Sequence, residues 1–523
     1  MLFSFLYTTL LVFLFFFRGI RGDLFKESYG MDIDEPLSDV GVHRALDGLT
    51  HLQDGSKGLK DFTPISNKIY QNQTQFYSFN VNTTTGVGEY YQFLVFLSGN
   101  ICSEPNSSDS KNNTRLFINY SYNTSIFLNL LQSESVSFAN GYFQALAHIP
   151  LSYTHGASNT ILYIAVTAPP TGDPSDTWHY QIGASQNDLV FQWDDRSWAS
   201  LIDSDDSSAL VVTGNLTYTA KLPNFDANLS RFSLYIYSYD KKDYFGSLNN
   251  SWCAVKNGPA LMETSNFSSK YTNRSGSLQQ EFYITGLNLS TKYVAYLISD
   301  LQGASIGGTL YQPFEFETMS DDTCKLIHDL DFCDKVAYSV PNSNLYSDDE
   351  LKKVYDNNSK TLFSNFSKAL QQVDCNTTKD AIYSPIRSCQ DCADSYKSWL
   401  CAVTIPRCST RNVTGYRYRK ADESRNDFVN DVIQPRSNYF EILPCVNVCQ
   451  AMVRDCPASF EFSCPSTNDS IQLSYYWDIP NEYSTCNYVG KIQRKSSLAS
   501  TISSTYLYKM VLFAQLLIIA TII

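Results

Sequence analysis

Cysteines are the residues of this 523-residue chain whose type and spacing most clearly allow chemistry. Twelve of the fourteen lie between Cys324 and Cys486, and only Cys102 and Cys253 come earlier. Thiols gathered in this way form either a disulfide framework or a metal site. Zinc sites usually combine Cys and His pairs at short spacing, whereas this region has one histidine and one Cys-x-x-C, which begins at Cys389. The pattern therefore favours disulfides, and with them an oxidising compartment.

Both ends of the chain carry apolar segments that bear on the compartment. The run from Leu2 to Phe17 is followed by arginine and glycine, which predicts a secretory signal peptide over residues 1–22, with an uncleaved anchor as the alternative. A polar spacer (489–509) precedes an apolar tail (510–523). Small residues, spacer and tail match a glycolipid (GPI) anchor signal, with Ser497 as the candidate attachment site. A retained C-terminal membrane anchor is the alternative.

Glycosylation signals agree with a secreted or surface protein. There are seventeen Asn-x-Ser/Thr sequons, and each used site marks a surface position. The candidate acceptors are Asn72, Asn82, Asn106, Asn112, Asn119, Asn123, Asn215, Asn228, Asn249, Asn266, Asn273, Asn288, Asn357, Asn365, Asn376, Asn412 and Asn468. The formal charge of -13 is spread along the chain, which favours solubility and argues against nucleic-acid binding.

The internal apolar runs are too short to cross a membrane as helices. The best candidates, Tyr90–Leu97 and Ile161–Val166, are less than half of the ~20 residues that a membrane-spanning helix needs. Both are rich in aromatic and β-branched residues, so they predict buried strands. The sequence therefore predicts no multi-span pore in this chain.

The sequence indicates a multidomain protein that begins with two β-sandwich-like domains. After a polar lead-in (23–64), short aromatic or β-branched runs alternate with Asn, Gly, Ser and Thr turns over 65–200, which predicts a β-sandwich or jelly roll. The acidic stretch Asp203–Ser207 is interpreted as a solvated linker. A calcium site is the alternative there, but the stretch lacks the residue order and the glycine of an EF-hand loop.

Residues 208–319 predict a second, fibronectin-type-like sandwich. Its clearest signal is Thr285–Tyr296, where a Gly-Leu turn leads through Thr-x-Tyr into an alternating strand, as in a tyrosine corner. Cys102 and Cys253 fall in different predicted sandwiches, so they either bridge the two or leave a free thiol, with a slight preference for the bridge.

Beyond residue 319 the pattern changes to helices among cysteines. Apolar residues at helical spacing predict a helix over Asp348–Leu370, with Ser347 or Asp348 as the N-cap. Cys445–Cys456 is a second helical candidate that places Cys445 and Cys449 on one face.

The cysteine spacings carry a family resemblance. Cys392-x8-Cys401, Cys401-x6-Cys408 and Cys445-x3-Cys449-x6-Cys456 resemble the core of a Frizzled-type cysteine-rich domain, here over 324–488. That resemblance implies a disulfide-rich, mainly α-helical fold with a defined pairing. Carried onto this sequence, the pairs are Cys324–Cys408, Cys333–Cys401, Cys392–Cys456, Cys445–Cys486 and Cys449–Cys464, with Cys375 and Cys389 left to pair with each other.

The order of the segments resembles one family in particular. A signal sequence, a glycosylated β-rich body, a Frizzled-like domain and a hydrophobic tail are similar to the fungal stretch-activated calcium-permeable channel components. The resemblance implies an auxiliary subunit of a high-affinity calcium influx channel, on the extracellular side of the plasma membrane. It also implies a large four-repeat pore-forming partner, on which residues 324–488 dock, and membrane attachment through the tail or a lipid.

Two other classes of function remain open at this point. A GPI-anchored cell-wall glycan-modifying enzyme needs only two suitably spaced carboxylates, although no common catalytic motif is present. A surface receptor for a lipidated ligand is the other alternative, with the extra Cys375/Cys389 pair and the Lys360–Leu370 segment able to fill its groove. The scattered histidines, among them His148 and His155, are interpreted as surface residues. No catalytic residue, metal site, cofactor or nucleic-acid partner is expected.

Overall fold

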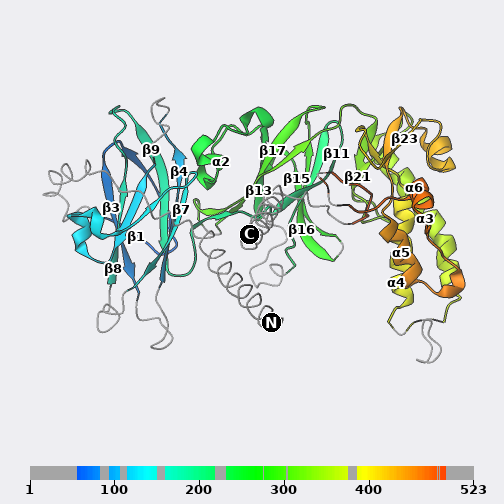
Figure 1. The fold of residues 1–523 in the computed structure, drawn as a ribbon, viewed down its shortest axis with the longest axis horizontal. Helices are drawn as coiled ribbons and strands as arrows, with labels where there is room; N and C mark the ends of the chain where they lie inside the picture. Colours follow the sequence, from blue (N-terminus) through cyan, green and yellow to red (C-terminus); the bar gives the residue numbers. More distant parts are fainter. Residues whose placement is uncertain are drawn as a thin grey trace, which may run out of the picture.

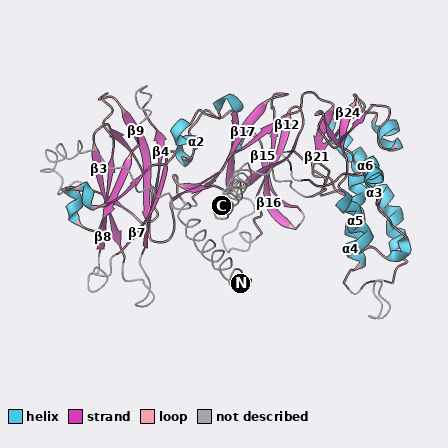
Figure 2. Ribbon diagram, in the orientation of Figure 1, coloured by secondary structure: helices cyan, strands magenta, loops and turns pink. Residues whose placement is uncertain are grey.

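The computed structural model describes residues 56–490, apart from 83–93, 106–114, 150–159, 218–230, 275, 302–303, 375–383, 385, 480 and 482. The predicted signal peptide, the polar spacer, the hydrophobic tail and Ser497 lie outside these residues. The described part is elongated, with two β regions followed by a region of helices and short strands (Figures 1 and 2). Among the described residues no helix is both long and apolar enough to span a membrane.

The first β region consists of two sheets. The five-stranded sheet has the order β1 (Lys57–Leu59), β3 (Thr74–Val81), β8 (Thr160–Thr167), β5 (Phe117–Ser121) and β6 (Glu134–Ser137). The four-stranded sheet has the order β2 (Ile65–Tyr70), β9 (Thr177–Ser185), β4 (Leu94–Ser103) and β7 (Tyr142–His148). Two short helical turns, η3 (Thr124–Phe127) and η4 (Leu130–Gln132), follow β5.

The two sheets share one apolar core. Trp178 of β9 is fully buried in it, and the hydroxyl groups of Tyr77 (β3) and Tyr180 (β9) lie 2.6 Å apart between the sheets. Because alternate side chains of each strand point inward, the predicted aromatic runs supply both inner faces. The end of the segment expected to be a polar lead-in (23–64) is part of this fold. Strand β1 lies within that segment, and its Leu59 is buried in the core.

The second β region also has two sheets. One has the order β10 (Phe191–Asp194), β18 (Gly308–Tyr311), β17 (Lys292–Asp300), β13 (Phe232–Ser238) and β14 (Met262–Glu263), with β19 (Phe314–Glu317) also paired to β17. The other has the order β11 (Ala199–Ser204), β12 (Ser208–Thr213), β16 (Ser277–Thr285) and β15 (Ser268–Arg274). Strands β10 and β11 therefore pair in the second region, although they precede its expected start at residue 208.

The tyrosine corner predicted from the sequence is present. The hydroxyl of Tyr293, in β17, accepts a hydrogen bond of 2.8 Å from the backbone N–H of Asn288, five residues upstream. This contact fixes the turn that leads into β17.

The two β regions are joined through the short helix α2 (Trp252–Lys256). Cys253 forms a disulfide with Cys102 at the end of β4, which is the bridge favoured from the sequence. Beside it, the backbone N–H of Trp252 donates to Asn100, and the Ser251 hydroxyl donates to the carbonyl of Ile101. The buried residues around α2 belong to the same apolar core as the first two sheets, so the two regions share a continuous interface.

The C-terminal region combines helices with small sheets. Its helices are α3 (Asp348–Leu370), α4 (Cys389–Thr404), α5 (Val446–Asp455) and α6 (Asn468–Ser474). Its strands are β20 (Cys324–Ile327) with β21 (Tyr338–Pro341), and β22 (Arg407–Ser409), β24 (Tyr439–Ile442) and β23 (Tyr416–Arg419). The other helical turns among the described residues are η7 (Tyr239–Lys241), η8 (Gly246–Leu248), η9 (Thr264–Asn266), η10 (Phe428–Ile433) and η11 (Ala458–Phe460).

Helix α3 has the bounds predicted from the sequence, and its start explains why. Ser347 and Glu350 form a capping box, and three acidic residues occupy the first turn. The other expected helix is α5, for which Cys445 is the N-cap. Helix α4 was not predicted, although Ser388 and Asp391 form a capping box at its start.

Candidate functional site: a disulfide-linked helical region and its junction

Disulfides link the elements of the C-terminal region to one another. The bridges are Cys324–Cys408, Cys333–Cys401, Cys392–Cys456, Cys445–Cys486 and Cys449–Cys464, the same pairs that the resemblance implies. Cys389 is also disulfide-bonded, but Cys375, its expected partner, lies outside the described residues. Bridges between β20 and β22 and between α4 and α5 restrict the unfolded chain and hold these elements together.

Aromatic side chains fill the space between α3 and α4. The rings of Phe366 (α3) and Tyr396 (α4) stack with their centroids 3.6 Å apart, and Phe363, Phe460 and Phe462 surround them. These contacts bury rings against one another beside the disulfide of α4 and α5. The helices therefore pack as one unit.

A turn of the second β region anchors this unit. The sequence suggested a solvated linker at Asp203–Ser207, and this interpretation is wrong: the stretch spans the end of β11 and the turn into β12, and Asp205 is 0% exposed. One carboxylate oxygen of Asp205 accepts bonds from the backbone N–H groups of Ser207 and Ser208. The other accepts the backbone N–H of Leu326 in β20 at 3.0 Å. Asp205 therefore stabilises the turn between β11 and β12 and also binds the backbone of β20 in the C-terminal region.

Asp203 makes the second polar link across this junction. Its carboxylate accepts a hydrogen bond of 2.9 Å from Nε of Arg407, in β22, and one of 3.1 Å from the backbone N–H of Ser339, in β21. The side chains of Asp203 and Arg407 are only 13% and 12% exposed. Around them, buried Leu210, Leu326 and Ala337 form a small apolar cluster. Polar and apolar contacts together fix the orientation of the helical region on the second β region.

Three potential metal ligands lie close together at the same junction, but cationic side chains already neutralise them. They are Glu281 (β16), His328 and Asp329. Arg274 pairs with the buried Glu281 at 2.5 Å, and Lys270 pairs with Asp329. The hydrogen bond from His328, with that from Lys270, holds the pKa of Asp329 well below its usual range. The group is best described as an ion-pair cluster between β15, β16 and the segment after β20.

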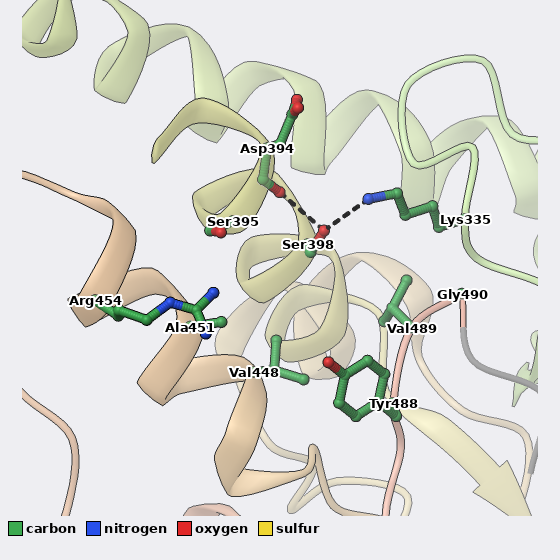
Figure 3. Close-up of a pocket in the computed structure, with 10 residues that line it drawn as sticks. All are labelled: Lys335, Asp394, Ser395, Ser398, Val448, Ala451, Arg454, Tyr488, Val489 and Gly490. Atoms are coloured by element: carbon green, nitrogen blue, oxygen red, sulfur yellow. Dashed lines mark hydrogen bonds between the residues drawn. The ribbon is translucent and has the colours of Figure 1, made fainter. Parts of the chain in front are cut away.

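A groove lies between α4 and α5 on the surface of the helical region (Figure 3). Its volume is about 440 Å³, and its apolar lining comes from Val448 and Ala451 of α5 and from Val489. Lys335 and Arg454 reach it from different elements. A second groove, of about 520 Å³, lies on the α3 side of α4 and is lined by Phe332, Phe363, Leu370 and Lys397 among others.

The candidate glycosylation sites are exposed at all but one of the described positions. Exposed acceptors are Asn72, Asn82, Asn123, Asn215, Asn249, Asn266, Asn273, Asn288, Asn357, Asn365, Asn412 and Asn468. Asn119 is 8% exposed, and its amide nitrogen donates to the hydroxyl of Ser133 at 3.1 Å. Since an N-linked glycan would be attached to that nitrogen, we expect Asn119 to carry no glycan. Asn106, Asn112, Asn228 and Asn376 lie outside the described residues.

Several residues of this site were not identifiable from the sequence. Asp203, Asp205 and Arg407 act together, but 204 positions separate Asp203 from Arg407 and no local motif joins them. His148, one of the two histidines considered together, is exposed in β7, and His155 lies outside the described residues.

Comparison with known proteins gives consistent matches over most of the chain. A family model described as a stretch-activated Ca²⁺-permeable channel component matches residues 94–492. The stretch-activated cation channel MID1 of Saccharomyces cerevisiae is 40% identical over 484 residues, which cover 83% of this chain and 87% of that protein. The stretch-activated cation channel yam8 of Schizosaccharomyces pombe is 32% identical over 344 residues, covering 65% and 69%.

Solved structures resemble this chain only distantly. The glycoside hydrolase domain of Endo-D from Streptococcus pneumoniae R6 is 11% identical and covers 49% of this chain and 33% of its own, with a TM-score of 0.19, too low to indicate a common fold. Family membership rests instead on the sequence matches, and the family model covers the cysteine-rich region, the second β region and the first β region from β4 onward. This chain belongs to the family of stretch-activated Ca²⁺-permeable channel components.

Proposed function

We propose that this chain is an extracellular auxiliary subunit of a plasma-membrane calcium influx channel. In this proposal residues 324–488 form a Frizzled-like cysteine-rich domain that docks on a separate four-repeat pore-forming subunit. The chain reaches the cell surface through the secretory pathway and stays at the membrane through its C-terminal tail or a glycolipid. The family description, a channel component, supports the channel assignment.

The observation that carries the docking proposal is the cross-linked helical unit and its fixed junction. Five disulfides hold its elements, and Asp203 and Asp205 fix it on the second β region. A preorganised surface loses little conformational entropy when it binds, so more of the contact energy appears as affinity. The fixed junction also means that the β regions and the docked unit move together, which suits a component of a channel that responds to stretch.

A receptor for a lipid chain requires open apolar space among the helices. The stacked rings of Phe366 and Tyr396, with Phe363 beside them, occupy the space between α3 and α4. The open groove on the α3 side of α4 is lined by Gln371, Asp394 and Lys397 as well as by apolar residues, and this mixed lining fits a protein surface better than a lipid chain.

Co-purification tests the proposal directly. Full-length chain isolated from membranes in mild detergent is expected to bring a large multi-span channel protein with it, and calcium uptake in a deletion strain is expected to depend on residues 324–488. Surface abundance of the truncated chain, measured by antibody labelling of intact cells, controls for loss of secretion. Recovery of the chain without any multi-span protein would overturn the proposal.

A further inference from the structure

We propose that the groove between α4 and α5 is the surface that receives the pore-forming subunit, and that its occupant is a loop of that subunit with a carboxylate next to an apolar side chain. The inference rests on the proposed function above, and it assigns which face of the helical region contacts the pore-forming subunit. Three observations support it: the placement of glycan acceptors, the lining of the groove, and its charge.

The glycan acceptors that the structure describes in the helical region lie outside α4, α5 and the segment 484–490. These exposed acceptors are Asn357 and Asn365 on α3, Asn412 after β22, and Asn468 on α6. The sequences of α4 and α5 contain no sequon, and neither does the 484–490 segment beside them. Because an N-linked glycan is bulky and hydrated, a protein interface has to lie where no glycan is attached. The α4–α5 face meets this condition.

The lining of the groove has the composition of a binding site for a protein loop. Val448, Ala451 and Val489 provide an apolar floor, and Tyr488 and Arg454 stand at its edge (Figure 3). Tyrosine and arginine are enriched at protein interfaces, where they combine apolar contact with hydrogen bonding. A volume of about 440 Å³ accommodates a few side chains at the tip of a loop.

The charge of the groove is complementary to a carboxylate. Lys335 donates to the hydroxyl of Ser398 at 3.3 Å, and Arg454 and Arg387 both pair with Asp455. Together with Asp394, which also lines the groove, these side chains carry three positive and two negative charges. The groove therefore has one excess positive charge on a protein whose formal net charge is -13. A carboxylate placed between Lys335 and Arg454 gains two cationic neighbours.

An added glycan tests the groove while leaving its charged side chains in place. Ala451→Asn with Val453→Thr creates a sequon on the α5 side of the groove, where Val453 is already 37% exposed. The matched control is Gln472→Asn, which creates a sequon with the native Ser474 on α6, one turn from Asn468. A mass shift on glycosidase treatment checks that both variants are glycosylated. Antibody labelling of intact cells checks that both are exported.

The groove variant is expected to lose at least 90% of the co-purified pore subunit and of the calcium uptake, while the α6 control keeps both. Equal co-purification by the two glycosylated variants would overturn the groove assignment and leave the proposed function standing. If no pore subunit co-purifies with the wild-type chain, both the groove assignment and the proposed function are wrong.

Charge reversal provides a second test that adds no bulk. Lys335→Glu is expected to weaken pore-subunit binding about tenfold, because the new carboxylate repels that of the loop. The binding that remains should depend less on salt concentration than wild-type binding does. Lys353→Glu, at an exposed position of α3, is the control and is expected to bind as the wild type does. Unchanged binding by the exported Lys335→Glu variant would contradict the proposed occupant.

Discussion

Nε of Arg407 lies 2.9 Å from the carboxylate of Asp203, and this ion pair joins two positions 204 residues apart, in β22 and β11. The pair is largely buried, so water can compensate only in part when either side chain loses its partner. Asp205, two residues further along, holds the backbone of β20. The helical region is therefore attached to the second β region by directional contacts in addition to the chain itself.

Replacing Asp203 tests this attachment. Asp203→Ala leaves the Arg407 guanidinium buried without its carboxylate, so we expect the free energy of unfolding to fall by about 3 kcal/mol. Glu423→Ala removes one partner of the exposed Lys420–Glu423 pair and is expected to cost less than about 1 kcal/mol. Denaturant unfolding of the purified extracellular part measures both. Equal effects would show that the junction pair contributes little, and adding Arg407→Leu to Asp203→Ala is expected to recover part of the loss.

The buried position of Asn119 predicts an unused sequon. Glycopeptide mass spectrometry of the secreted chain is expected to find Asn119 unmodified, whereas the neighbouring exposed Asn123 is available for modification. Asn119→Gln should leave the glycan mass unchanged and lower stability by about 1 kcal/mol, because its hydrogen bond to Ser133 is lost. A glycan found on Asn119 would contradict the packing of β5 against η4.

The Cys102–Cys253 bridge is expected to stabilise the contact between the two β regions without creating it. Replacing both cysteines with serine should lower the free energy of unfolding by about 2–4 kcal/mol. The apolar contacts around Trp252 and the hydrogen bond from Ser251 to Ile101 remain, so the regions should stay associated. Limited proteolysis under native conditions checks this: rapid separation of the two β regions would mean that the disulfide alone holds them.

The lowered pKa of Asp329 predicts that the folded protein loses stability in acid. Its pKa is lowered in the folded protein by the hydrogen bonds from His328 and Lys270, so its contribution is complete above the unfolded pKa of about 4 and is lost as the pH falls below that value. The difference in melting temperature between the wild type and Asp329→Asn should therefore be largest above about pH 4 and should narrow at lower pH. Asp331→Asn, at an exposed position nearby, is the control. A difference that stays constant with pH would contradict the ion-pair cluster.

Local signals in the sequence were enough to predict several elements. Capping residues and apolar spacing defined α3, and the Gly-Leu turn before Tyr293 identified the tyrosine corner. Both depend on interactions within a few residues. Family cysteine spacing implied the same five pairs that join the helical region.

Long-range contacts account for what the sequence did not reveal. The acidic residues at 203–207 have the composition of a solvated turn, and only the fold brings Arg407 and Leu326 to them. Helix α4 was missed because its cysteines were considered as a spacing motif, although Tyr396 and Leu400 repeat at helical distance. Asn119 has the same sequon pattern as its exposed counterparts, and burial alone distinguishes it.

Cross-linking mass spectrometry of the chain purified with its pore subunit tests the central claim most directly. A lysine-reactive cross-linker should join the pore subunit to Lys335, at the groove between α4 and α5, and to Lys397 of α4, at the second groove. Lysines of the first β region, such as Lys57 and Lys68, should give few or no such links. Links confined to the first β region, with none to Lys335 or Lys397, would contradict docking through the cysteine-rich region.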